Sequence, residues 1–407
     1  MASARPAGSP DLAFLSGTPG IGGKLKSVPE DFLVEEILPD GTVLELGKRM
    51  EMPDQPGRFT HFILEKNNWT TAFAIREIAN RLRSSHKNFG FAGSKDKCAV
   101  TTQLASGFGI NREALLALGI RGISINGAWG AKDKVRLGDL AGNRFTIRVN
   151  RPKDGAETSV EAIRSELGGR FPNYFGEQRF GSSRRNTHIV GEKIIRGDYE
   201  AAAMSFLCDS EGEENQEAKL ARKELLDTRD FKAALRVFPR HLKLERSMIS
   251  HLAEKPADFT GAFLALPRQT LLLFVHAFQS HLFNRLLSER MGEGDVVMEE
   301  GEYLCPVSSS GFPDLEKMDV DGWLCIKILG YNSNPNERER KLLDSLGIKK
   351  DDFRVKGTPE VGSKGTFRTA FAPFIGFSFS DPVFRFSLQS GSYATAALRE
   401  FLEVNKP

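Results

Sequence analysis

One aspartate with a lysine on each side lies in the segment FAGSKDKCAVTTQ, residues 91–103. Lys95 and Lys97 place two ammonium groups beside Asp96, and neighbouring positive charge favours the ionised form of a carboxyl group. An ionised carboxylate can act as a general base or as a nucleophile. Gly, Ser and Asp are also common in turns, so a polar surface turn is the plain alternative. The segment therefore predicts either a turn or a catalytic carboxylate at Asp96.

A phosphate-binding loop is a third interpretation, and the spacing argues against it. The P-loop motif has four residues between its two glycines and a Lys-Ser or Lys-Thr pair after the second glycine. Gly90 and Gly93 are too close together for this motif, and Lys95 is followed by Asp96, whose charge would repel phosphate. We therefore do not expect a phosphotransferase with a P-loop.

The cysteine and histidine spacing predicts no metal site. The four cysteines, Cys98, Cys208, Cys305 and Cys325, form no CxxC pair and suggest no disulfide framework. The seven histidines are scattered, and the zinc motif HExxH does not occur. We expect four free thiols and no bound metal.

The composition indicates a soluble globular protein. The chain has 407 residues, more than one ordinary core accommodates, with 40% hydrophobic and 27% charged residues. No apolar run approaches the roughly 20 residues that span a bilayer. The first residues, MASARPAGSPDLAFLSG, lack the long apolar core of a secretory signal. We therefore expect a cytoplasmic protein that does not cross a membrane.

The net charge of +3 is unevenly distributed along the chain. Residues 81–200 contain 21 Lys and Arg against 12 Asp and Glu, a local charge of +9. Such a basic segment is typical of proteins that contact nucleic-acid phosphates. A solvated surface with an ordinary excess of Lys and Arg explains the same count, and the composition leaves both interpretations open.

Several segments could position Asp96. DFLVEEIL at 31–38, RFTHFILEK at 58–66 and RFTIRVN at 144–150 have the partial alternation of strands. TTAFAIREIANRLRSSHK at 70–87 predicts a helix that Thr70 or Thr71 caps, with Phe73 in its apolar stripe. ETSVEAIRSELGGRF at 157–171 predicts a second helix, with a possible capping box from Thr158 to Glu161.

The central and final parts of the chain have different patterns. Residues 200–255 read as charged helices, and QTLLLFVHAFQSHLFNRLLSERM at 269–291 predicts one long, largely buried helix. DPVFRFSLQSGSYATAALREFLEV at 381–404 predicts a strand followed by a closing helix. The fold class is therefore α+β, with a mostly helical domain inserted into a strand-rich one. We expect the domain segments 1–172, 173–370 and 371–407, the last completing the sheet of the first.

Six sequence blocks resemble the TruD family of tRNA pseudouridine synthases, in the order of that family and across nearly the whole chain. They are PEDFLVEE (29–36), GSKDKCAVTTQ (93–103), AGNRFTI (141–147), PNYFGEQRFG (172–181), HAFQSHLFNRLLSER (276–290) and GSYATAALRE (391–400). The resemblance implies a catalytic domain of pseudouridine-synthase type with a mixed, largely antiparallel sheet. It also implies an inserted, mostly helical domain that is specific to the family.

The same resemblance implies a reaction. The protein would isomerise uridine to pseudouridine in tRNA, at uridine 13, without a cofactor and after flipping the base out of its stack. Asp96 matches the catalytic aspartate of the family, either as a nucleophile or as the base that removes the C2′ proton. Lys26 matches a lysine beside that aspartate, and Lys24, two residues away, is the alternative.

Four further residues match substrate-binding positions. Asn143 and Phe145 match positions that hold the flipped base, although Phe145 also fits the buried side of its strand and Asn143 fits a turn. Arg179 is a candidate phosphate contact or an interdomain residue. Tyr393 is a candidate aromatic residue of the cleft or the start of the last helix.

The expected partner is folded tRNA, and we expect a monomer. The runner-up interpretation is an RNA-binding module of the same fold that has lost catalysis. The two differ in whether replacing Asp96 abolishes the function of the protein.

Overall fold

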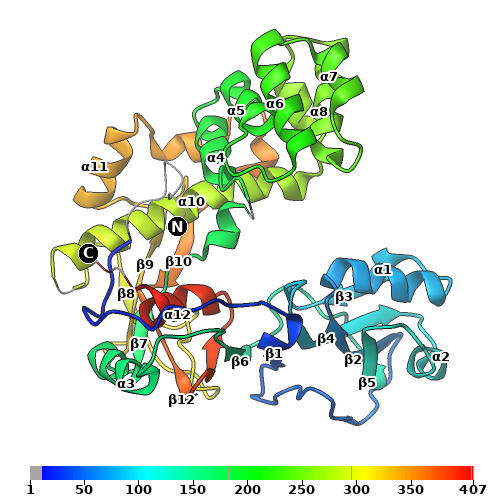
Figure 1. Ribbon diagram of the computed structural model, residues 1–407, viewed down its shortest axis with the longest axis vertical. Helices are drawn as coiled ribbons and strands as arrows, with labels where there is room; N and C mark the ends of the chain where they lie inside the picture. The colour runs from blue at the N-terminus through cyan, green and yellow to red at the C-terminus, as the bar shows by residue number, and fades with distance from the viewer. Residues whose placement is uncertain (1–11, 182, 295, 405, 407) are drawn as a thin grey trace.

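The computed structural model describes residues 12–404 and 406, except 182 and 295. Residues 1–11, the start of the first predicted domain segment, lie outside the described residues. Figure 1 shows the main sheet in the lower half of the molecule and helices α4 to α11 above it. Strands from the first and the last parts of the chain form this sheet.

The main element is an eight-stranded sheet with the order β12-β13-β6-β1-β4-β2-β5, with β3 paired to β4. Its pairs are antiparallel except β1 with β4, which run parallel. The strands are β1 (Phe32–Ile37), β2 (Phe59–Asn67), β3 (Phe89–Phe91), β4 (Val100–Phe108), β5 (Ile123–Ala131), β6 (Gly142–Arg148), β12 (Ile375–Ser380) and β13 (Val383–Gln389). The predicted mixed, largely antiparallel sheet is confirmed.

Strand β6 lies between strands from the two ends of the chain. Phe145 pairs with Val34 of β1 on one side and with Phe386 of β13 on the other. The alternation read from RFTIRVN is confirmed, because Phe145 and Ile147 are buried while Arg148 is exposed. The final segment therefore completes the sheet, and the predicted pairing of distant segments is correct.

Four helices pack beside this sheet: α1 (Thr71–Arg81), α2 (Arg112–Leu116), α3 (Ala156–Leu167) and α12 (Ala394–Leu402). The Oγ1 atom of Thr70 accepts a hydrogen bond from the Phe73 backbone nitrogen and caps α1, as predicted. Phe73 itself is exposed, so its predicted place in the apolar stripe is wrong. The capping box of α3 is also wrong, because Gly155, in the left-handed region at φ 75°, precedes a helix that begins at Ala156.

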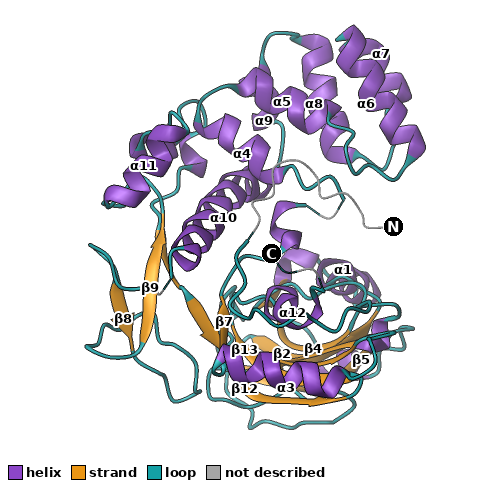
Figure 2. Ribbon diagram, turned by 60° about the vertical axis from the view of Figure 1, so that its left-hand side comes forward, coloured by secondary structure: helices purple, strands orange, loops and turns teal. Residues whose placement is uncertain are grey.

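The helices between residues 187 and 345 of the chain have their own hydrophobic core. They are α4 (Thr187–Ile195), α5 (Tyr199–Cys208), α6 (Gln216–Thr228), α7 (Phe231–Val237), α8 (Lys243–Glu254), α9 (Phe259–Leu264), α10 (Arg268–Gly292) and α11 (Glu337–Ser345). Helix α10 is the predicted long helix, with Phe274 and Phe278 buried beside Val190 and Ile194 of α4. Figure 2 shows these helices gathered above the strands.

Two small sheets join the helices to the main sheet. One has the order β10-β9-β8 and contains β8 (Tyr303–Cys305), β9 (Trp323–Ile328) and β10 (Thr366–Thr369). The other pairs β7 (Arg170–Pro172) with β11 (Phe371–Pro373). The chain therefore leaves the main sheet region through β7 and returns through the neighbouring β11.

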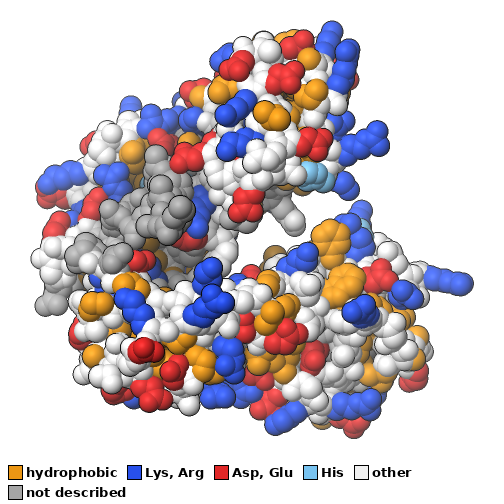
Figure 3. Space-filling model, in the orientation of Figure 1, with side chains coloured by type: hydrophobic (Ala, Val, Ile, Leu, Met, Phe, Trp, Pro, Cys, Tyr) orange, Lys and Arg blue, Asp and Glu red, His pale blue; other side chains and the backbone are white. Residues whose placement is uncertain are grey.

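The space-filling view shows a wide opening between the helical part and the part of the sheet that carries α1 (Figure 3). Lys and Arg side chains occur on both of its sides. Among the described residues, no helix has the length and the apolar character required to cross a membrane.

Candidate active site

Asp96 lies in the loop between β3 and β4, and side chains of neighbouring elements hold this loop. The Nε2 atom of Gln103 donates to the Gly93 carbonyl oxygen at 3.0 Å. The Lys95 backbone nitrogen donates to Oγ1 of Thr71, in the first turn of α1, at 2.9 Å. The Asp96 side chain keeps 47% of its surface exposed. The loop thus presents an accessible carboxylate on a fixed backbone.

Lys26 is the lysine that contacts this carboxylate. Its Nζ atom donates to Oδ2 of Asp96, and it also lies 4.1 Å from the centre of the Phe32 ring. Lys24 instead pairs through its backbone with Asn150 and is exposed. The two candidate lysines therefore differ in geometry, and Lys26 is the partner of Asp96.

A second lysine, not expected from the sequence, supports the same loop from inside the protein. Lys66 of β2 is 0% exposed, and its Nζ atom donates to the Asp96 backbone carbonyl at 2.7 Å. Burial lowers the pKa of Lys66 to about 8, although the negative charge of Asp96 opposes that shift. The signal in the sequence was a lysine within the apolar strand segment FILEK.

Lys95 does not serve the role suggested by its place beside Asp96. Its Nζ atom donates to Oε2 of Glu36 at 2.6 Å, and both side chains are buried. The other carboxylate oxygen of Glu36 accepts from the Leu104 backbone nitrogen at 2.9 Å. The interpretation that both flanking lysines face Asp96 is therefore wrong for Lys95, which ties the loop to β1 and β4.

Asp96 opens into a pocket of about 380 Å³. Its lining includes three of the predicted substrate-binding residues, Asn143, Phe145 and Tyr393. Phe145 forms part of the pocket and of the core together, since its ring lies 6.1 Å from that of Phe32 and 5.6 Å from that of Phe386. Phe145 is therefore a core residue that also lines the pocket, and its contact with a bound base stays a prediction.

The side chain of Asn143 contains a hydrogen-bond acceptor that lacks a donor among the residues that the structure describes. Its Oδ1 atom is buried and has no hydrogen-bond partner within the described part of the chain. A buried polar atom without a partner costs free energy, on the order of 1–3 kcal/mol. An acceptor of this kind in the lining of a pocket is suited to a ligand that brings an N–H group.

The wall that carries Tyr393 is held by a buried cation. Arg368 of β10 donates to the Asn173 carbonyl oxygen at 2.8 Å, to Oδ1 of Asn173 at 2.6 Å and to the Gly391 carbonyl oxygen at 3.0 Å. Its guanidinium group also lies 4.2 Å from the centre of the Phe175 ring. Burial lowers the pKa of Arg368 to about 10, which leaves it charged at neutral pH. Tyr393 directly precedes α12, so it is both a pocket residue and the start of the last helix.

Arg179 lies elsewhere. Its Nε atom donates to Oγ of Ser280 on α10 at 3.3 Å, and its guanidinium group lies 5.9 Å from the Phe175 ring centre. It does not line the Asp96 pocket, whereas its neighbour Gln178 does. Gln178, Phe32 and Leu137 also line this pocket, and no motif in the sequence indicated them.

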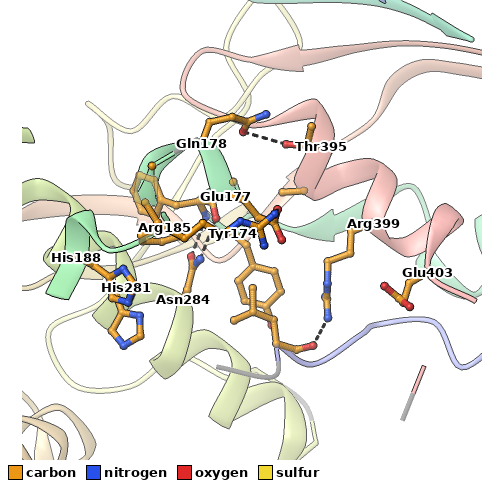
Figure 4. Close-up of a pocket in the computed structure, with 16 residues that line it drawn as sticks. Tyr174, Glu177, Gln178, Arg185, His188, His281, Asn284, Thr395, Arg399 and Glu403 are labelled. Atoms are coloured by element: carbon orange, nitrogen blue, oxygen red, sulfur yellow. Dashed lines mark hydrogen bonds and ion pairs between the residues drawn. The ribbon is translucent and has the colours of Figure 1, made fainter. Parts of the chain in front are cut away.

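A second pocket of about 460 Å³ adjoins the first, and Gln178 and Thr395 line both. Figure 4 shows the side chains of His188 and His281 close together at one end of it and those of Arg399 and Glu403 at the other. The two histidine rings stack with centres 4.6 Å apart. Burial, with the nearby His188 and Arg285, lowers the pKa of His281 to about 3, so it is neutral at neutral pH. Asp96 does not line this second pocket.

The described residues contain no cluster of three or more His, Cys, Asp or Glu side chains that could hold a metal ion. Cys98, Cys208, Cys305 and Cys325 are free thiols. The Asp96 pocket brings together a carboxylate, an amide and aromatic rings, and the Lys26 ammonium group contacts the carboxylate.

Comparison with known proteins identifies relatives over nearly the full chain. The family profile of tRNA pseudouridine synthase D (TruD) matches residues 12–401. A Methanocaldococcus jannaschii protein named “Probable tRNA pseudouridine synthase D 1” is 38% identical over 94% of this chain and 96% of its own length. An Archaeoglobus fulgidus protein named “Probable tRNA pseudouridine synthase D” is 36% identical, over 96% of this chain and 97% of its own.

A solved structure gives the same result. A crystal structure of a Methanosarcina mazei protein named “Putative tRNA pseudouridine synthase D (TruD)” is 31% identical to this chain. It superimposes with a TM-score of 0.74, over 97% of this chain and 96% of its own. The profile match and these relatives agree with the six sequence blocks and with the sheet observed here. The chain therefore belongs to the TruD family of tRNA pseudouridine synthases.

Proposed function

We propose that this protein, a tRNA pseudouridine synthase and hence an isomerase by family membership, acts on uridine 13 of tRNA through Asp96 and without a cofactor. The observation that carries the proposal is the shared lining of one pocket. Asp96, Asn143, Phe145 and Tyr393 face the same volume of about 380 Å³, although they come from three distant parts of the chain.

The reaction moves one bond of the nucleotide. The bond between C1′ and N1 of uracil breaks, the detached base turns, and C5 bonds to C1′ while the C5 hydrogen leaves as a proton and N1 gains one. A carboxylate assists either by attacking covalently or by removing the C2′ proton so that a glycal forms. Asp96 supplies the carboxylate in both routes, and the ammonium group of Lys26 contacts its Oδ2 atom.

The remaining lining residues hold the base. A flipped uracil presents the N3–H donor between two carbonyl acceptors, and protein sites read such an edge with an amide. We assign Oδ1 of Asn143, buried without a partner among the described residues, to N3–H. Phe145 and Tyr393 offer ring surfaces for the base or its ribose. Arg179 remains a proposed contact to an RNA phosphate outside the pocket.

The opening between the helical part and the sheet is the proposed tRNA-binding surface. We further propose that residues 173–370 act as one inserted domain, between catalytic segments 1–172 and 371–407. Phosphate contacts from the basic segment 81–200 would set the position of the tRNA, and shape rather than base sequence would select the site. We expect the protein to act as a cytoplasmic monomer.

Locating the product tests the substrate part of the proposal. A tRNA transcript is incubated with the protein, and pseudouridine is mapped by chemical labelling and primer extension. We expect one stop, at position 13, and no stop in a matched transcript with cytidine at that position. Pseudouridine at another position would refute the assignment to uridine 13 while leaving the isomerase activity intact. No pseudouridine in any tRNA would instead favour an RNA-binding module without catalysis.

A further inference from the structure

Leu137 is an exposed leucine at the edge of the catalytic pocket. Its side chain is 76% exposed, yet it lines the same pocket as Asp96. Among the large hydrophobic side chains that are exposed in the described part of the chain, Leu137 alone lines this pocket. Scattered exposed leucines are common and need no explanation, but one at the mouth of an active site has a defined neighbour, the bound substrate.

The backbone around Leu137 is held on both sides. The Gly138 nitrogen donates to the Ala92 carbonyl oxygen at 2.9 Å, and the Asp139 nitrogen donates to the Arg136 carbonyl oxygen at 3.2 Å. The Arg136 nitrogen in turn donates to Oδ2 of Asp139 at 2.6 Å. Val135, just before the turn, is 4% exposed. Leu137 is therefore presented at the tip of a hydrogen-bonded turn.

The turn is attached directly to the catalytic loop. Ala92, which accepts the bond from Gly138, begins the loop that carries Asp96 and also lines the pocket. Lys132 and Arg136 are exposed on the same segment, as are Asp133 and Asp139. An apolar tip with exposed cations beside it matches an RNA strand, in which stacked bases alternate with charged phosphates.

A uridine inside folded RNA must leave its stack before it can reach a pocket of this kind. Its removal exposes the faces of the neighbouring bases and leaves a gap between them. Apolar side chains that insert between bases stabilise such unstacked steps in other nucleic-acid complexes. We propose that Leu137 enters the gap left by the target uridine and stabilises the flipped state. This inference rests on the proposed function, because it presupposes that the uridine is flipped toward Asp96.

Two protein contacts are the alternatives for an exposed leucine here, a second copy of the chain or closure of the helical part onto the turn. The observations favour RNA for two reasons. The leucine borders the volume that must receive the base, and on the segment that carries it Lys132, Lys134 and Arg136 outnumber Asp133 and Asp139. Both alternatives predict no effect on base unstacking, which can be measured.

The first experiment measures the rate of isomerisation. Wild type, Leu137→Ala and Met318→Ala are compared under single-turnover conditions with tRNA tritiated at uridine C5. Met318 is a matched control, since it is also 76% exposed but lies outside the pocket lining. We expect Leu137→Ala to lower the rate roughly tenfold or more. Met318→Ala should isomerise uridine at the wild-type rate. Leu137→Met should keep most of the wild-type rate.

The second experiment reports flipping without chemistry. The Asp96→Asn protein is mixed with tRNA that carries 2-aminopurine next to the target uridine, and the fluorescence rise on unstacking is recorded. Adding Leu137→Ala should reduce this rise severalfold, while the affinity for tRNA changes by less than about threefold because phosphate contacts dominate it. If Leu137 only supported the fold, its replacement would lower the fluorescence rise and the affinity for tRNA together.

The outcomes distinguish this inference from the function on which it rests. No tritium release by the wild type would refute the proposed function itself. Release by the wild type with equal rates and equal fluorescence for Leu137→Ala would refute only the role of Leu137. A dimer that dissociates on Leu137→Ala with an unchanged rate would assign the leucine to a contact between copies, and would overturn the inference as well.

Discussion

At the scale of single residues, three lysines near Asp96 have three different functions in the structure. Lys26 contacts the carboxylate, Lys66 holds the backbone carbonyl of the same residue, and Lys95 is buried against Glu36. Adjacency in the sequence did not predict this division. Lys95 is next to Asp96 in the chain but turns into the protein, whereas Lys26 and Lys66 come from distant segments.

Removing the Lys26 charge should lower catalysis without greatly lowering affinity for tRNA. We expect Lys26→Met to reduce kcat roughly 10²-fold, because a preorganised charge beside the reacting group is lost. Lys24→Met is the matched control and should retain activity. Steady-state tritium release at saturating tRNA checks this, and equal losses in the two variants would contradict the assignment of Lys26.

Because of Lys66, the free energy of unfolding should increase as the pH rises above about 8. In the native state the pKa of Lys66 is about 8, against 10.5 for an unperturbed lysine. Between these values the unfolded chain binds the extra proton, so this group raises the free energy of unfolding as pH increases, by about 1.4 kcal/mol per pH unit. The cost of the buried charge is therefore present below pH 8 and is relieved above it.

Urea unfolding of wild type and Lys66→Met from pH 7.5 to 9.5 tests this expectation. The wild type should gain stability relative to the variant as pH rises. The exposed Lys97→Met serves as a control and should follow the wild type. Parallel curves for wild type and Lys66→Met would show that Lys66 does not titrate in this range.

At the scale of elements, hydrophobic periodicity predicted most of what was observed. The alternation in RFTIRVN placed Phe145 correctly, and the apolar run of 269–291 gave α10. The predicted capping box failed because a left-handed glycine, Gly155, begins α3 earlier. Phe73 fits the helical period but faces solvent, since its neighbours Ile75 and Ile78 already fill the contact with the sheet.

The contacts between elements were not readable from the sequence. Arg368 of β10 forms hydrogen bonds to Asn173 and to the turn at Gly391. Asn173 lies 195 residues before Arg368 in the chain. Nothing local marks an arginine in a short strand as the centre of such a network. The same holds for Oδ1 of Asn143, whose lack of a partner only appears once the pocket is assembled.

Replacing Arg368 should loosen the wall of the pocket that carries Tyr393. Arg368→Met leaves the Asn173 and Gly391 carbonyl groups without their donor, and we expect the free energy of unfolding to fall by about 2–4 kcal/mol. The catalytic rate should fall with it. Arg385→Met, an exposed arginine on β13, should change stability by less than about 0.5 kcal/mol. Chemical denaturation compares the two, and similar small effects would contradict the structural role.

At the scale of the whole molecule, the opening between the helical part and the sheet is the surface that we propose for tRNA. Composition left a polyanionic partner and a solvated surface equally open. Membership of the TruD family favours tRNA as the partner, and Figure 3 shows Lys and Arg side chains on both sides of the opening. The fold class and the family were predictable because six blocks span the chain, whereas the shape of the opening was not.

Affinity for tRNA should depend steeply on salt. If about four phosphates are neutralised, the dissociation constant should rise roughly 10²-fold between 50 and 200 mM salt, because bound counterions are released on association. Filter binding with the Asp96→Asn protein measures this without turnover. A flat response across that range would show that phosphate contacts do not dominate binding.

The central claim is that Asp96 performs the chemistry in the pocket that it shares with Asn143, Phe145 and Tyr393. The most direct test is tritium release from tRNA labelled at uridine C5, compared for wild type, Asp96→Asn and Asp227→Asn, the last an exposed aspartate on α6. We predict release by the wild type and by Asp227→Asn, and a loss of at least about 10³-fold for Asp96→Asn with tRNA binding retained. Release by Asp96→Asn at the wild-type rate would contradict the account.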